Sequence, residues 1–202
     1  MCTGDVLDRG EDDPDEVLDE LLRRGVRLLA GNHELAYLGG PTFAGMADGR
    51  SHVVRERLRE LALDGKLRAA AAVGDVLCCH GGITRAFWER HLRTECGSDV
   101  TQVASTLNRW FLRGIARRDL THPIFASMAD PMPGPFWAHL EDDVLAGGTP
   151  PFRQAVGHVV TWPPGWRSLE SGGSVFPLDW GAHHPDGSIG HLVMDETGDW
   201  WV

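Results

Sequence analysis

The chain has 202 residues, of which 42% are hydrophobic and 24% are charged, and its formal net charge is -10. These proportions are typical of a globular protein, and the length predicts one domain over residues 1–202. The negative charge argues against a nucleic-acid backbone as the main partner, because such binding needs a basic surface. A phosphorylated small molecule or a phosphoprotein stays possible if metal ions and a few arginines make the site locally positive.

The N-terminus and the cysteines predict a cytoplasmic location and no membrane contact. Residues 1–5 lack the basic and apolar segments of a signal peptide, and no apolar run is long enough to cross a bilayer. The cysteines show no zinc-type pairs, and the adjacent Cys78 and Cys79 are poorly placed for an ordinary disulfide. Both features indicate a reducing compartment.

The first 34 residues predict a strand–loop–helix–strand–loop unit. Asp13 is the expected N-cap of the helix, Pro14 its first residue, and Gly25 the residue that ends it. Residues 26–30 then form a short apolar strand. Polar clusters at residues 4–10 and 31–34 therefore fall in loops at the carboxyl ends of neighbouring parallel strands, where open α/β sheets place their sites.

The rest of the chain predicts helices first and strands afterwards. We expect a short helix and a glycine-rich connection over residues 35–48, a helix over 52–63 and a strand over 74–79. Thr84 is expected to cap a helix that ends near residue 93, and Asp99 a longer one. Residues 122–148 are expected to be irregular, and short strands to follow at 154–156, 175–178, 189–194 and 200–202. This order predicts an α/β (α+β) fold with a two-sheet, sandwich-like core flanked by helices.

Four polar residues share one sequence context. Asp5, Asn32, His80 and His158 each follow a predicted strand, and each adjoins a glycine. A carboxylate, an amide oxygen and two imidazoles suit Mn, Fe or Zn better than Mg or Ca. Taken alone, Asp5 could cap a turn and His80 could be a core histidine, but the repeated context favours metal ligands.

Three further residues in the first two clusters suit phosphate chemistry. The guanidinium of Arg9 could grip two phosphate oxygens. His33 could protonate a leaving alkoxide, and Asp8 could hold its tautomer.

These motifs resemble those of a known family. The segments Gly-Asp-Val-Leu-Asp-Arg-Gly at 4–10, Gly-Asn-His-Glu at 31–34, His-Gly-Gly at 80–82 and Gly-His at 157–158 are similar, in order, to motifs of the calcineurin-like metallophosphoesterases. Within that family they resemble most the branch of the phosphoprotein phosphatases and symmetrical diadenosine tetraphosphatases. Four ordered motifs are far more specific than any one of them.

The resemblance implies a hydrolase with two divalent metal ions. Asp5 would bridge the two ions, and Asn32, His80 and His158 would complete one of them. A hydroxide held between the ions would attack phosphorus, Arg9 and Asn32 would orient the phosphate, and His33 paired with Asp8 would be the general acid. The implied substrates are phosphate monoesters, including phosphoproteins, or dinucleoside polyphosphates.

One motif of the family is absent from this sequence. The family begins with Asp-x-His-Gly on a first strand, upstream of the motif at 4–10, and that motif supplies ligands for the other ion. Only one of the two metal sites is therefore complete here. Three explanations compete: N-terminal sequence is missing, the chain is a catalytically impaired pseudoenzyme that still binds phosphate or metal, or another residue substitutes. We favour missing sequence, because every other motif is intact.

Overall fold

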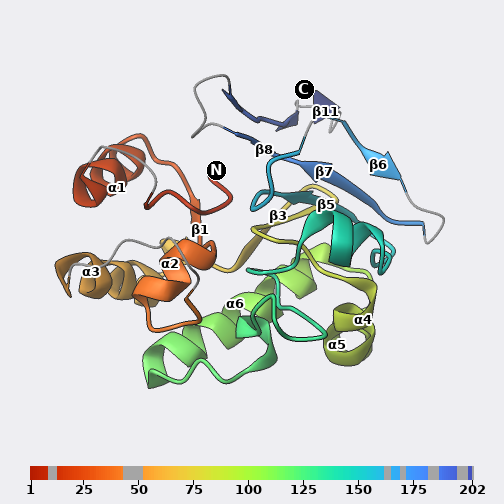
Figure 1. Ribbon diagram of the computed structural model, residues 1–202, viewed down its shortest axis with the longest axis horizontal. Helices are drawn as coiled ribbons and strands as arrows, with labels where there is room; N and C mark the ends of the chain where they lie inside the picture. Colours follow the sequence, from red (N-terminus) through yellow and green to blue (C-terminus); the bar gives the residue numbers. More distant parts are fainter. Residues whose placement is uncertain are drawn as a thin grey trace.

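The computed structural model describes residues 1–8, 13–42, 52–161, 165–168, 172–181, 187–194 and 200–201 (Figure 1). Its helices are α1 (Pro14–Arg23), α2 (Asn32–Tyr37), α3 (His52–Leu63), α4 (Arg85–Phe87), α5 (Arg93–Cys96) and α6 (Val100–Arg117), with the shorter or wider turns η1 (Trp88–Leu92), η2 (Pro123–Phe125) and η3 (Leu140–Leu145). Its strands are β1 (Leu28–Leu29), β2 (Leu67–Arg68), β3 (Ala70–Val73), β4 (Val76–Cys79), β5 (Arg153–Val156), β6 (Arg167–Ser168), β7 (Ser174–Pro177), β8 (Asp179–Trp180), β9 (Ser188–Ile189), β10 (Val193–Met194) and β11 (Trp200–Trp201).

A five-stranded mixed sheet forms the centre of the molecule. Its order is β3-β4-β5-β7-β6, with β4, β5 and β7 parallel and the two outer strands antiparallel to their neighbours. Cys79 at the end of β4 pairs with Val156 at the end of β5. The residues that follow these two strands, His80 and Gly157, therefore leave the sheet side by side, and the Gly157 N–H donates to the His80 carbonyl at 2.8 Å.

The N-terminal residues belong to a second, smaller parallel sheet. Cys2 forms a parallel bridge with Leu28 of β1, and β1 pairs in parallel with β2. The N–H of Cys2 donates to Arg27, and its carbonyl accepts from Leu29. Residues 4–5 and 31–32 consequently follow adjacent strand ends, as the sequence predicts.

Two apolar clusters join the two sheets. Val76, Cys78 and Ala155 of the large sheet form one apolar cluster with Leu29 of β1, whereas Leu77 and Cys79 belong to the larger core that includes α6. Leu28 of β1 and Leu67 of β2 belong to that larger core as well, so α6 packs against strands of both sheets. This arrangement confirms the predicted α/β fold with two sheets and outer helices.

The helices follow their expected signals, with two differences. Asp13 caps α1 and accepts from the Asp15 N–H at 2.8 Å, and Asp99 caps α6 through Thr101 and Gln102. The helix capped by Thr84 is divided into α4, η1 and α5, because residues 88–92 form a wider π-helical turn. The second difference lies at residue 32, where α2 begins three residues earlier than predicted.

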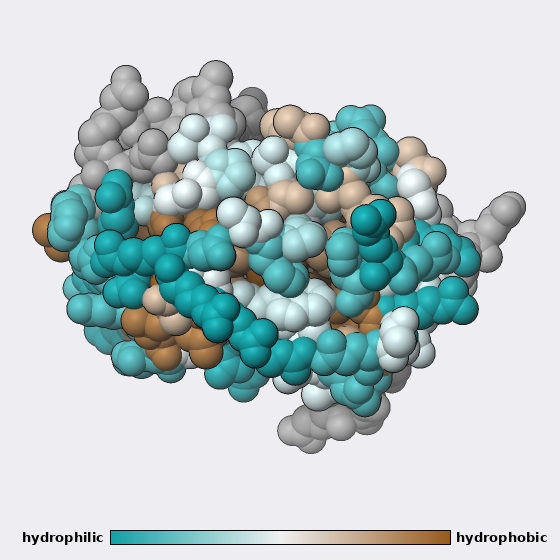
Figure 2. Space-filling model, turned by 90° about the horizontal axis from the view of Figure 1, so that it is seen from below, coloured by the Kyte–Doolittle hydropathy of each residue, from teal (hydrophilic) through white to brown (hydrophobic). Residues whose placement is uncertain are grey.

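Figure 2 shows how polar and apolar side chains are distributed on one face of the molecule. The face shown in Figure 2, which is the side of α6, is mostly hydrophilic, and apolar side chains appear there in separate patches. Among the described residues, no helix combines the length and the apolar character needed to cross a bilayer. The prediction of one domain over residues 1–202 stays a prediction.

Candidate metal centre

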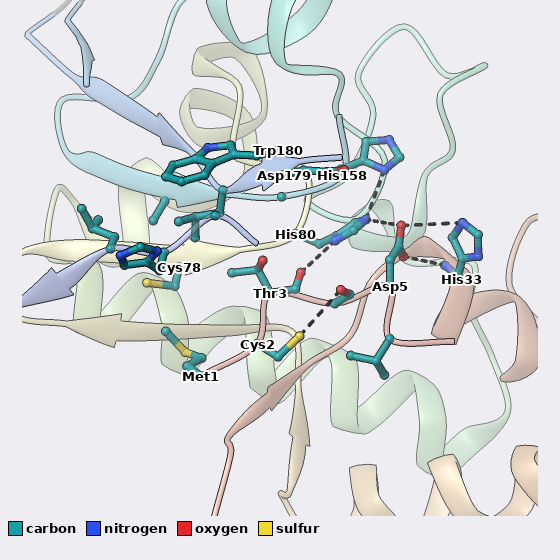
Figure 3. A pocket seen from close by; sticks show the side chains of 18 of the residues that line it. Met1, Cys2, Thr3, Asp5, His33, Cys78, His80, His158, Asp179 and Trp180 are labelled. Atoms are coloured by element: carbon teal, nitrogen blue, oxygen red, sulfur yellow. Dashed lines mark hydrogen bonds and ion pairs between the residues drawn. The ribbon is translucent and has the colours of Figure 1, made fainter. Parts of the chain in front are cut away.

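The four predicted ligand residues meet at the carboxyl ends of the strands. His80 Nε2 lies 3.0 Å from Asn32 Oδ1, 3.1 Å from His158 Nδ1 and 3.2 Å from Asp5 Oδ2. The Asn32 oxygen position is also 3.1 Å from His158 Nδ1 and 3.2 Å from both Asp5 oxygens. Figure 3 shows Asp5, His80 and His158 directed toward one point. Residues from four strand ends thus form a single centre.

The inward atoms of this centre are mostly hydrogen-bond acceptors. His80 Nδ1 lies 2.8 Å from the Thr3 carbonyl, which accepts its proton, so the lone pair of Nε2 faces inward. The Asn32 oxygen faces only acceptors. Rotation of the Asn32 amide would supply two N–H donors, and a proton on His158 Nδ1 would supply one, whereas a divalent cation would satisfy all the inward atoms together. The donor set therefore fits a metal ion.

Burial and mutual charge determine the protonation of these groups. Burial, followed by the neighbouring His80, lowers the pKa of His158 to about 3, so this imidazole is neutral and able to ligate. Burial acts to raise the pKa of Asp5, but the imidazoles of His80 and His33 lower it below its usual range. Burial acts in turn to lower the pKa of His80, but the Asp5 carboxylate outweighs burial and raises this pKa above its ordinary value. The carboxylate is therefore ionised in the folded protein.

Unusual backbone conformations aim these side chains. Asp5, Asp8 and His158 have φ angles of 54°, 65° and 72°, in the left-handed region that residues with a Cβ rarely adopt. Among the described residues, Arg118 at the end of α6 is the only other non-glycine residue with positive φ. Backbone strain in folded proteins concentrates at functional sites, and here it coincides with the acceptor centre.

The glycines beside the ligands allow close packing of the two N-terminal loops. A Cβ at Gly31 would lie 2.2 Å from Asp5 Oδ1 and 2.7 Å from the Asp5 nitrogen. A Cβ at Gly4 would lie 2.5 Å from the Gly31 nitrogen. The glycine context that the sequence shows therefore has a steric reason.

The predicted acid pair lies beside the centre. His33 Nδ1 is 3.1 Å from Asp8 Oδ2, and the hydroxyl of Tyr37 donates to Asp8 Oδ1 at 2.9 Å. The other ring nitrogen, His33 Nε2, is 3.6 Å from Asp5 Oδ2 and so points toward the centre. The structure brings His33 and Asp8 together as the sequence predicts. Arg9, the predicted phosphate contact, lies outside the described residues.

Three contributors to the site were not foreseen from the sequence. Thr3 orients His80 through its carbonyl, Tyr37 contacts Asp8 through its hydroxyl, and Glu34 contacts the loop that carries Asp5. A sequence signal existed only for Glu34, because a glutamate three residues after a helix N-cap is typical of a capping box.

A groove of about 1220 Å³ opens beside the centre. Its polar end contains Asp5, Asn32, His33, His80 and His158, and its other end is lined by apolar side chains that include Met1, Cys2, Cys78, Trp180 and Leu192. Figure 3 shows the polar and apolar ends joined along residues 1–5. The centre is therefore accessible to a small molecule.

Comparisons with known proteins agree with these features. The family model of calcineurin-like phosphoesterases matches residues 1–162. No curated protein sequence matched the chain. Two solved structures are similar at 21% identity: an I115M mutant of a cold-active protein tyrosine phosphatase, with a TM-score of 0.58, and the cold-active protein tyrosine phosphatase at 1.1 Å, with a TM-score of 0.51.

At this identity the two structures show a shared fold. The matches cover 96% of this chain and 63% and 62% of the two phosphatase chains, so this chain spans less than two thirds of their length. The family model covers most of the present sequence. The chain belongs to the calcineurin-like phosphoesterase family.

Proposed function

We propose that this protein is a metal-dependent phosphoesterase of the cytoplasm. The observation that carries this proposal is the convergence of Asp5, Asn32, His80 and His158 on one acceptor-rich point. The mixed nitrogen and oxygen set favours Mn, with Fe or Zn as alternatives. The proposed substrates are phosphate monoesters, including phosphoproteins, or dinucleoside polyphosphates.

Each residue of the site has a separate task in this proposal. Asp5, Asn32, His80 and His158 hold the cation. A divalent cation bound there supplies a water of lowered pKa and polarises the phosphoryl oxygens. Asn32 and Arg9 orient the phosphate group. These assignments follow the inward direction of the side chains and, for Arg9, the sequence motif alone.

The protein supplies the proton for the leaving group through His33. Its Nε2 faces the centre, while Nδ1 is held by the buried Asp8 carboxylate. That contact fixes the orientation of the ring and keeps Nε2 directed toward the centre. His33 can therefore deliver a proton at Nε2 to an oxygen that leaves a phosphate bound beside Asp5.

A second candidate function is binding of a cation or a phosphate without turnover. It is favoured by a separate observation: within the residues that the structure describes, one group of histidine and acidic side chains has ligand geometry, namely Asp5, His80 and His158. The resemblance of the motifs implies two ions. A centre that holds only one ion would bind phosphate but would hydrolyse it poorly.

Metal analysis and hydrolysis of p-nitrophenyl phosphate with added Mn²⁺ separate these candidates. The phosphoesterase proposal expects bound Mn²⁺ and turnover, both lost in His80→Ala and both retained in His91→Ala, which removes a histidine whose ring lies tilted against Phe87 away from the centre. Bound Mn²⁺ without turnover would favour the second candidate. If the wild-type protein bound no divalent ion, the metal site would be refuted for both candidate functions.

A further inference from the structure

The side chain of Glu34 is fully buried and contacts the backbone of both N-terminal loops. Its Oε2 accepts from the N–H of Gly31 at 2.7 Å and of Asp5 at 2.9 Å. Its Oε1 accepts from the N–H of Val6 at 3.0 Å and of Leu7 at 3.2 Å. One carboxylate thus receives four backbone N–H groups, which is the full hydrogen-bonding capacity of its ionised form.

These contacts hold the backbone of a segment whose Asp5 side chain also accepts from the His33 N–H at 3.2 Å. Residues 3–7 have no regular helix or strand, and Asp5 and Asp8 are in the left-handed region. Three of the four N–H groups belong to this segment, and the fourth belongs to Gly31, which adjoins Asn32. Glu34 therefore ties the strand end that carries Asp5 to the strand end that carries Asn32.

We propose that Glu34 is a positioning residue of the metal centre. Its carboxylate fixes the loop over residues 5–7, so that the two Asp5 oxygens face Asn32, His80 and His158 instead of solvent. This proposal rests on the proposed function, because it assumes that those residues hold a cation. Glu34 itself does not reach the cation, since both of its oxygens are occupied by backbone N–H groups.

The number of donors makes the proposal sensitive to a minimal substitution. In Glu34→Gln, one oxygen becomes an NH₂ group that cannot accept, whichever way the amide is turned. Two of the four backbone N–H groups then face another donor inside the protein, and the loop must move to hydrate them. Substitution of residues that orient metal ligands typically lowers metal affinity by about 10- to 100-fold.

Asn108→Ala provides a matched control. Asn108 of α6 also braces backbone, because its Oδ1 accepts from the N–H groups of Ala69 and Ala70 and its Nδ2 donates to the Ala70 carbonyl. It contacts none of the four ligand residues. A general loss of backbone support would therefore affect Asn108→Ala as much as Glu34→Gln.

The experiment measures Mn²⁺ affinity by calorimetry and amide hydrogen exchange by NMR on the metal-free protein. We expect Glu34→Gln to bind Mn²⁺ about 10- to 100-fold more weakly than wild type, and the amides of Asp5, Val6 and Leu7 to exchange at least about tenfold faster. Asn108→Ala should change neither quantity by more than about twofold, in keeping with the near-independence of distant sites. Unchanged affinity and unchanged protection of these three amides in Glu34→Gln would overturn the proposal.

The two readouts separate this proposal from the proposed function. If wild type bound no Mn²⁺, the metal function would fail, and the exchange data would still show whether Glu34 holds the loop. If Glu34→Gln did not fold, the exchange rates of the wild-type amides alone would test the positioning role. Unprotected amides at Asp5, Val6 and Leu7 in the folded wild type would refute the positioning role.

Discussion

The substitution Asp8→Asn tests the proton-delivery step with little change in shape. Asn enters the left-handed region as readily as Asp, so the φ of 65° at this position can be kept. The amide oxygen can still accept from the Tyr37 hydroxyl, which leaves the NH₂ group facing His33 Nδ1. His33 then loses its carboxylate partner, and its Nδ1 becomes an acceptor.

The expected loss follows from the contact that disappears. Asp8 Oδ2 lies 3.1 Å from His33 Nδ1, and the exposures of the two side chains are 6% and 4%. A hydrogen bond to a charged group contributes about 1.5–3 kcal/mol. If the hydrogen bond stabilises the transition state by that whole amount, its loss lowers the rate roughly 10- to 100-fold, at 1.36 kcal/mol for each factor of ten.

The assay compares two leaving groups under Mn²⁺. We expect kcat for a phosphoserine peptide to fall by roughly 10- to 100-fold, because a serine alkoxide needs a proton when it leaves. Hydrolysis of p-nitrophenyl phosphate should change by less than about threefold, because p-nitrophenolate leaves with little protonation. Asp99→Asn is the control, since Asn and Asp cap a helix equally well. Equal losses on both substrates, or no loss on the peptide, would refute the role of this pair.

Three further predictions address the centre and the core. Mn²⁺ at 100 times its Kd adds about 2.7 kcal/mol to the free energy of unfolding and is expected to raise Tm by about 5–11 °C in scanning fluorimetry. The His158→Ala variant should show no such rise. If Tm still rose on addition of Mn²⁺, His158 would not be a ligand. Gly31→Ala is expected to lower Mn²⁺ affinity at least about tenfold in calorimetry, because its Cβ would displace Asp5, and wild-type affinity would contradict the close approach of the loops. Burial raises the pKa of Cys78 and Cys79 from 9.0 to about 12. Between these two pH values the thiols ionise in the unfolded chain but not in the folded one. The free energy of unfolding therefore keeps its full value below pH 9 and falls by about 1.4 kcal/mol per thiol at pH 10. Urea unfolding at pH 8 and pH 10 measures this loss, and a double Cys→Ala variant should not show it.

Local signals made much of the fold predictable from the sequence. Asp13 and Pro14 define the start of α1, the apolar run Val76–Cys79 defines β4, and a short segment that runs into Gly157 indicates β5. Because a parallel sheet brings its carboxyl ends to one edge, the strand ends also predicted which polar residues would meet. The grouping of Asp5, Asn32, His80 and His158 needed only strand positions and no knowledge of side-chain contacts.

The directions of the side chains were less predictable, because they depend on tertiary contacts. Residues 32–34 look like a loop in the sequence, but Glu34 turns back to the backbone, and α2 begins at Asn32. The orientation of His80 depends on the carbonyl of Thr3, which any residue type would offer equally. Positive φ at His158 has no clear sequence signal either, since histidine is enriched in the left-handed region but adopts it at only a small fraction of its positions.

The candidate metal centre therefore depends on groups that hold its ligand residues in place without being ligands themselves, and we call these groups anchors. Asp5 is held by the three N–H contacts of its loop to Glu34 and by the His33 N–H, and His80 is held by the Thr3 carbonyl. Together they hold one carboxylate, one amide and two imidazoles within hydrogen-bond distance of one another. A cation that binds this arrangement in the folded state alone adds stability. The same reasoning explains why loss of an anchor should weaken cation binding even though the anchor never touches the ion.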